Sequence, residues 1–175
     1  DAGTAVTTGD DNVLIGYQAG DSLSTGLRNT AVGSLSFGVS AGAQDNTAIG
    51  YNALNAVTGD QNVAVGAYAL DANTSGTRNT AVGWTSLSAI VTASDSTAVG
   101  YNALGLDTGG SNTAVGSRAG DGITTGTGNV AIGLNALGGA SHGAATDNIG
   151  IGNNAGTAIA ASGNQNVMIG TSAGA

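Results

Sequence analysis

Few side chains in this sequence could carry out catalysis. The 175 residues include one histidine, His142, and eleven acidic residues, all of them aspartates, but no Cys, Glu or Lys. An enzyme needs a positioned acid, base, nucleophile or metal, and no pair of aspartates stands out as the two carboxylates of a glycosidase. His142 lies in a glycine-rich insertion at residues 138–143, where we expect it to be solvated. We therefore expect a protein without enzymatic activity, with no catalytic residue and no bound cofactor.

Aspartates in glycine-containing turns raise the hypothesis of a calcium site, because this ion prefers hard oxygen ligands. The turn aspartates are Asp10, Asp11, Asp21 and Asp60. Calcium-binding rolls built from nonapeptides carry an aspartate in every turn. Here Asp21 recurs only at 50-residue intervals, as Asp71 and Asp121, which is too sparse for the three to share an ion. We expect solvated turn residues and no metal ligand, with calcium binding kept as an alternative.

Aromatic rings and threonines are the other groups that could bind a partner. The rings are Tyr17, Tyr51, Tyr68, Trp84 and Tyr101. They could stack on sugars or on a partner protein, or they could pack over a corner of the fold, and the sequence leaves both interpretations open. The threonines that could form an ice-binding array are Thr30, Thr47, Thr80, Thr97 and Thr113. Because they share a face with valines that we assign to the interior, ice binding is an alternative and not the leading hypothesis.

A repeat of 16–19 residues must position all of these groups. The phrase Asn-Thr/Val-Ala-Val/Ile-Gly occurs, with small variations, ten times along the chain. Its glycines are Gly16, Gly33, Gly50, Gly66, Gly83, Gly100, Gly116, Gly133, Gly152 and Gly170. Such self-similarity is typical of a solenoid in which each repeat forms one coil.

Each phrase is predicted to form a short β-strand. The residue before the glycine is Val or Ile in all ten copies, and the residue two places earlier is β-branched in all ten, which is the period-two pattern of a strand. We expect these two columns to be buried. The alanines between them, such as Ala48 and Ala64, should form an outward stripe that accepts close packing. A second, weaker strand is expected after each glycine.

Two further columns predict how the coils stack. Asparagine opens the phrase in nine copies and Ser96 in the other, and we expect a ladder of amides in which each side chain bonds to the next coil. The preceding column contains Asp11, Arg28 and Asp45, so stacking would place an arginine between two acids. The predicted fold is an all-β parallel β-solenoid of about ten coils stacked at about 4.8 Å. It spans residues 1–175 as one domain and is expected to be a fragment of a longer fibrous protein.

The composition excludes several classes of partner. The formal net charge is −8 and the only bases are three arginines, whereas nucleic acids and anionic membranes attract positive charge. No apolar run approaches the roughly 20 residues of a membrane-spanning helix. With 32 glycines and neither Glu nor Lys, long helices are not expected.

The repeated phrases resemble those of a known family. They include residues 29–33 (Asn-Thr-Ala-Val-Gly), 46–50 (Asn-Thr-Ala-Ile-Gly) and 129–133 (Asn-Val-Ala-Ile-Gly). These phrases are similar to the YadA-like head repeats of trimeric autotransporter adhesins, and to repeats of bacteriophage tail fibres and other surface fibres, although the repeat here is longer than the adhesin-head unit. The resemblance implies a left-handed parallel β-roll, with three chains side by side in a homotrimer or fibre. It also implies a place outside the cell, on a cell surface or on a virion.

The leading functional hypothesis is a non-enzymatic structural and adhesive rod. Its lateral face would bind a host-surface protein or a glycan, with no nucleic-acid partner and no insertion into a membrane. The alternatives are a ligand-binding solenoid, either calcium-dependent or ice-binding, and, more remotely, a polysaccharide-degrading fibre.

Overall fold

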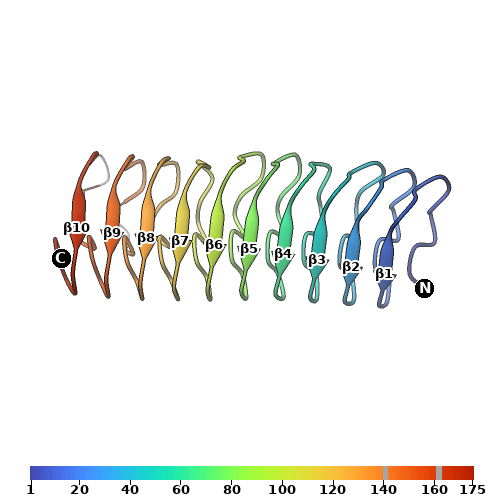
Figure 1. Ribbon diagram of the computed structural model, residues 1–175, viewed down its shortest axis with the longest axis horizontal. Helices are drawn as coiled ribbons and strands as arrows, with labels where there is room; N and C mark the ends of the chain where they lie inside the picture. The colour runs from blue at the N-terminus through green and yellow to red at the C-terminus, as the bar shows by residue number, and fades with distance from the viewer. Residues whose placement is uncertain (140–141, 161–162) are drawn as a thin grey trace.

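The computed structural model describes residues 1–139, 142–160 and 163–175. Ten strands form one parallel sheet in chain order along a rod (Figure 1). They are β1 (Val13–Ile15), β2 (Thr30–Val32), β3 (Thr47–Ile49), β4 (Val63–Val65), β5 (Thr80–Val82), β6 (Thr97–Val99), β7 (Thr113–Val115), β8 (Val130–Ile132), β9 (Ile149–Ile151) and β10 (Val167–Ile169). The predicted all-β parallel solenoid is therefore confirmed. We number each coil by the strand that it contains.

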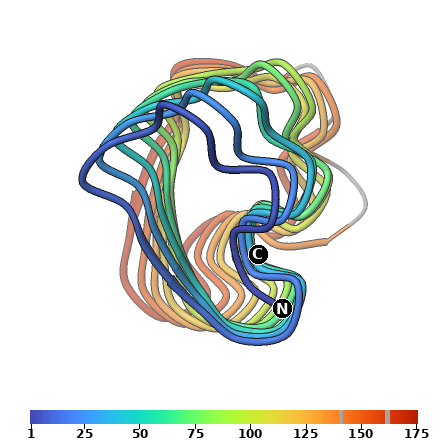
Figure 2. The same ribbon diagram turned by 90° about the vertical axis from the view of Figure 1, so that its right-hand side faces the viewer.

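The register of the sheet follows the repeat. Ala48 of β3 lies beside Ala64 of β4, and Ile49 lies beside Val65. Every other pair of neighbouring strands is aligned in the same way, so each column of the sequence repeat is also a column of side chains in space. Viewed along the rod, the coils lie one behind another (Figure 2).

The chain after each phrase glycine forms a compact turn and not the weaker strand that the sequence predicted. In coil 3 the second and fourth residues after Gly50, which are Asn52 and Leu54, have φ angles of 56° and 50°. Left-handed backbone at every second residue bends the chain tightly. An extended ladder therefore cannot form on this side of the coil.

The two faces of the strands are reversed relative to the sequence prediction. Ala48 and Ala64 are fully buried, whereas Ile49 points outward and is 39% exposed. The physical reason is that the turn supplies the large interior side chains. Leu54 and Leu70, each at the fourth position after a phrase glycine, are fully buried in the core, and the space that remains opposite them holds a methyl group. The Val/Ile columns must consequently face away from the coil interior.

The interior volume is shared between the strand and the turn. In coil 1 the fourth residue after the phrase glycine is Gly20, and the middle residue of β1 is Leu14 in place of alanine. A Cβ on Gly20 would lie 2.6 Å from Leu14 Cδ2, so the leucine occupies the space that the missing side chain leaves. Met168 of β10 has the same relation to Gly174, where an added Cβ would lie 2.9 Å from the methionine sulfur.

The asparagine column forms the predicted ladder. The Oδ1 atom of Asn46 accepts a hydrogen bond of 2.8 Å from the backbone N–H of Asn62, and its Nδ2 donates to the carbonyl of Gly59 at 3.1 Å. Asn62 repeats this pattern toward Asn79 and Gly76. Both asparagines are buried, and a buried amide whose donors and acceptor are paired stabilises the stack without leaving groups for a ligand. The structural interpretation of this column is therefore supported.

The charged column confirms the stacking order. Arg28 Nε lies 2.6 Å from Asp45 Oδ1, and Arg78 has the same contact with Asp95 at 2.6 Å. The hydrogen bond from Arg28 lowers the pKa of the Asp45 carboxyl below its ordinary value. Both pairs are well exposed to solvent, so they contribute little to stability. They do demonstrate that residues of successive repeats lie side by side.

Candidate functional site

The outward side of the sheet is a continuous apolar face, which we call the strand face. Its first column comprises Val13, Thr30, Thr47, Val63, Thr80, Thr97, Thr113, Val130, Ile149 and Val167, and its second comprises Ile15, Val32, Ile49, Val65, Val82, Val99, Val115, Ile132, Ile151 and Ile169. Ile132 of β8 is 38% exposed, and Ile15 of the terminal strand β1 is 59% exposed. The threonines that the sequence prediction placed in the interior also lie on this face, because the whole strand is turned the other way.

The size of the strand face makes it a candidate for association. Ten strands spaced at about 4.8 Å, each about 10 Å long, give a face of roughly 500 Å². The largest apolar patch on an ordinary monomer is about 300–600 Å², and patches of this size are commonly interaction sites. Every residue of the strand face is Val, Ile or Thr, so it carries no charge that burial would have to desolvate.

Four rings in consecutive coils form a second exposed feature, which we call the aromatic corner. It consists of Tyr51, Tyr68, Trp84 and Tyr101 of coils 3 to 6, which are between 37% and 49% exposed. Tyr51 and Tyr68 meet edge to face with centroids 5.3 Å apart, and Trp84 stacks on Tyr101 at 5.2 Å with planes 10° apart. The rings therefore pack on one another and also present surface to a partner. Tyr17 stands apart in coil 1 and is 65% exposed.

His142 is buried, which corrects the prediction of a solvated loop residue. It is 1% exposed, its Nε2 lies 2.5 Å from the Gly156 carbonyl oxygen and its Nδ1 lies 3.3 Å from that of Gly139. The cause is its place in an interior column that the sequence analysis missed. This column comprises Leu23, Ser40, Val57, Asn73, Ile90, Asp107, Ile123, His142 and Ile159, in which apolar and polar residues alternate. Ala140 and Ser141, from the same insertion, lie outside the described residues.

Asp107 is a fully buried carboxylate in this interior column. Its Oδ1 accepts hydrogen bonds from the Gly109 amide at 2.9 Å and from Asn112 Nδ2 at 3.1 Å, and its Oδ2 lies 3.4 Å from the Ser96 hydroxyl. Burial raises the pKa of the Asp107 carboxyl, and the hydrogen bonds offset part of that rise. Since the folded chain then holds the proton more tightly than the unfolded chain, stability falls as pH rises from about 3.9 through the folded-state pKa.

Replacing Asp107 by asparagine should raise the melting temperature at pH 7 by roughly 2–4 °C, because the amide keeps the shape and removes the buried charge. Asn73 already occupies this position in coil 4 and accepts a hydrogen bond of 3.0 Å from the Gly76 amide. The gain should shrink as pH falls from the raised folded-state pKa of Asp107 toward about 3.9, below which the carboxyl is protonated in both states. Thermal denaturation between pH 3 and pH 8 tests this, with exposed Asp10→Asn as the control. A lower melting temperature for Asp107→Asn at pH 7 would contradict the prediction.

The turn aspartates stay apart in space. Asp21, Asp71 and Asp121 occupy the same position in coils 1, 4 and 7, and three coil spacings separate each pair by about 14 Å. Asp60 is engaged by the backbone, since its Oδ1 accepts a hydrogen bond of 2.8 Å from the Gln44 amide. Among the residues that the structure describes, no group of three or more His, Cys, Asp or Glu side chains is placed to hold a metal ion.

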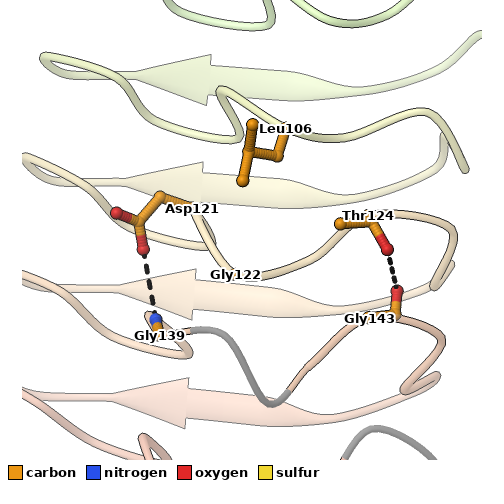
Figure 3. Close-up of a pocket in the computed structure, with 6 residues that line it drawn as sticks. All are labelled: Leu106, Asp121, Gly122, Thr124, Gly139 and Gly143. Atoms are coloured by element: carbon orange, nitrogen blue, oxygen red, sulfur yellow. Dashed lines mark hydrogen bonds between the residues drawn. The ribbon is translucent and has the colours of Figure 1, made fainter.

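A surface hollow of about 340 Å³ lies between coils 6 and 8 (Figure 3). It is lined by Leu106, Asp121, Gly122, Thr124, Gly139 and Gly143. Asp121 Oδ1 accepts a hydrogen bond of 3.3 Å from the Gly139 amide, and the Thr124 hydroxyl donates to the Gly143 carbonyl at 2.9 Å. Two of the polar groups in the wall are thus bonded to the wall itself. A specific small-molecule site requires polar groups that converge on the ligand, and these two do not.

Comparison with known proteins returns no match. No protein-family model, no curated protein and no solved structure matches this chain. Within the described part of the chain, no helix has the length and hydrophobicity needed to cross a membrane. The strand face and the aromatic corner are therefore the features of the chain from which we infer its function.

Proposed function

We propose that this chain is a non-enzymatic structural and adhesive rod that assembles as a homotrimer through its strand face. It would form part of a bacterial surface adhesin or of a phage or other extracellular fibre. The observation that carries the proposal is the continuous outward face of Val, Ile and Thr on ten stacked strands. Assembly through this face leaves the other sides of each coil free to bind a host-surface protein or a glycan. The resemblance of the phrases to trimeric adhesin heads supports three as the number of chains.

The energetics favour a second copy of the same chain as the partner of the strand face. At about 25 cal/mol per Å², burial of roughly 500 Å² of face contributes ~12 kcal/mol, which compares with association costs of about 4–15 kcal/mol. β-Branched side chains are already restricted at χ1, so they lose little further freedom in an interface. Because the face is uncharged, chains with a net charge of −8 can bury it while keeping their aspartates in solvent.

The test of this proposal is the molar mass in solution. The native chain should have three times its 16.5 kDa mass by light scattering at micromolar concentration. A double variant, Val65→Asp with Val99→Asp, places charges on β4 and β6 and should be monomeric with an unchanged circular dichroism spectrum. Ser75→Asp, on an exposed turn, is the matched control and should remain trimeric. A monomeric native chain, or a double variant with the native mass, would refute assembly through the strand face.

Ice binding is the second candidate, because the threonines lie outward. Thr80, Thr97 and Thr113 occupy three consecutive strands, which presents hydroxyl and methyl groups at a regular spacing of about 4.8 Å. This function requires a free strand face and so competes with assembly. Ice binding predicts a monomer that produces thermal hysteresis, which Thr97→Asp abolishes. A native trimer without hysteresis excludes it.

A further inference from the structure

The strand face by itself does not define how far one copy can slide along another. Its two columns repeat the same residue types at every coil, so a shift by one coil brings equivalent groups together again. Register is weakly specified wherever a sheet presents such a uniform surface. If the chains assemble through this face, as proposed above, a feature that is confined to certain coils must mark their alignment.

The aromatic corner is such a feature. Large rings occupy this corner only in part of the rod, whereas Ser34 stands at the equivalent position in coil 2 and Ser117 in coil 7. In coil 3 the strand ends at the outward Ile49, and Tyr51 follows it two residues later, at the start of the turn. We propose that the aromatic corner is part of the self-association interface and fixes the axial register between copies of this chain. This inference rests on the proposed function.

The area of the strand face supports this assignment. A stable interface buries about 800 Å² per partner, and the strand face alone supplies roughly 500 Å². An aromatic side chain buries about 150–250 Å², so four rings that are nearly half exposed add roughly 300–400 Å². The strand face and the aromatic corner together therefore reach the size that the strand face alone does not.

The geometry of the rings favours a protein partner over a sugar. A sugar ring stacks on the free face of an aromatic ring. Trp84 and Tyr101 lie nearly parallel at 5.2 Å and so cover one face of each other. Their edges and the half-exposed Tyr51 and Tyr68 form a short ridge over three coil spacings, about 14 Å long. A shift by one coil would place one end of this ridge against a coil with a small residue at the corner and would lose ring contacts.

The test uses a ring-free chain built from residues that the protein already has at these positions. Tyr51→Ser, Trp84→Ser and Tyr101→Ser copy Ser34 and Ser117, and Tyr68→Asn copies Asn52. The matched control is Tyr17→Ser, which removes an exposed ring at the same position in coil 1, separated from the aromatic corner by Ser34 of coil 2. Circular dichroism and the melting temperature verify that each variant folds.

Register is measured by disulfide trapping, since the native chain has no cysteine. Chains carrying Thr80→Cys are mixed with chains carrying Thr113→Cys, dissociated, reassembled and oxidised. The two positions lie two coils apart, about 10 Å along the rod, and a disulfide spans at most about 7 Å between Cα atoms. Copies in register give only disulfides between identical positions. A shift by one coil brings the two positions within about 5 Å along the rod, and a shift by two coils brings them level, so both shifts give mixed disulfides.

We expect almost no mixed disulfides in the native background or with Tyr17→Ser, and a several-fold larger mixed fraction in the ring-free background. If the ring-free chain dissociates while the native chain and the Tyr17→Ser chain stay assembled, that result also places the rings in the interface. A ring-free chain with native mass and a native disulfide pattern would overturn the inference while leaving the proposed function intact. Loss of binding to a glycan array in that same chain would then assign the rings to sugar recognition. A monomeric native chain, by contrast, defeats the proposed function itself.

Discussion

Replacing Gly50 by alanine is expected to destabilise the chain by about 4 kcal/mol. Gly50 has a φ of +136°, a conformation that is strained for any residue with a Cβ. An added Cβ would also lie 2.6 Å from the carbonyl oxygen of Gly66 in the next coil. The atoms that the new Cβ would meet belong to the backbone of the next coil. They cannot move away without separating the stacked strands. The melting temperature should fall by roughly 8–16 °C.

Two control variants separate the causes of this effect. Gly170 has nearly the same conformation, with a φ of +127°, but an added Cβ there would meet only Ala173 Cβ at 4.0 Å. Gly170→Ala therefore measures backbone strain without the steric clash. Gly42→Ala lacks the positive φ and meets only the Thr25 hydroxyl at 3.3 Å, so it should be nearly neutral. If Gly50→Ala and Gly42→Ala melted at the same temperature, close stacking at the phrase glycine would not hold the coils together.

The features that could be predicted from the sequence are those that depend on the repeat alone. The spacing of the repeated phrase predicted that the coils stack, that their strands are parallel and which residues lie beside one another, because a column of equivalent residues can form only if the coils align. The amide ladder and the contact between Arg28 and Asp45 followed from the same alignment. The repeat also identified the strand itself, since β-branched residues recurred with period two.

The orientation of the strand could not be obtained from hydrophobicity, because all three strand columns are apolar or β-branched. The prediction that Val and Ile are buried follows general statistics, which do not apply when the turn already fills the interior with residues such as Leu54. A signal for the correct orientation was present. The middle strand residue is larger in coil 1 and coil 10, as Leu14 and Met168, where the turn carries Gly20 and Gly174. In coils 7 and 9 the strand residue stays small, and the leucine of the preceding coil packs against the turn glycine instead. Such compensation in volume occurs between side chains that share one core.

The candidate site was missed for the same reason. Once the strand is turned, the valines and threonines that were assigned to the core become the strand face, and the alanines become the core. The burial of His142 was missed because its insertion obscured its alignment with Ile123. Both residues lie six places before the asparagine of the next phrase, so counting back from the asparagine would have identified the interior column.

Ala81→Asp is the prediction that discriminates most directly between the two orientations of the strand. Ala81 lies in the middle of β5, between Ala64 and Ala98, and is fully buried. An aspartate there would place a carboxylate in an apolar interior with no cation in the column to pair with it, at a cost of about 4 kcal/mol or more. We expect loss of the β-sheet circular dichroism signal or a melting temperature lower by at least about 10 °C.

The neighbouring substitution Val82→Asp is the matched control, because it introduces the same group one residue away on the strand face. Its carboxylate would project from the coil and remain solvated in the separated chain, so the variant should keep the native spectrum and a melting temperature close to that of the monomeric Val65→Asp/Val99→Asp chain. Both substitutions are made in the monomeric Val65→Asp/Val99→Asp background, so stability is compared on separated chains and the comparison needs no assumption about the partner. If Val82→Asp unfolded the chain and Ala81→Asp did not, the alanine column would be the outer one and the strand face would not exist.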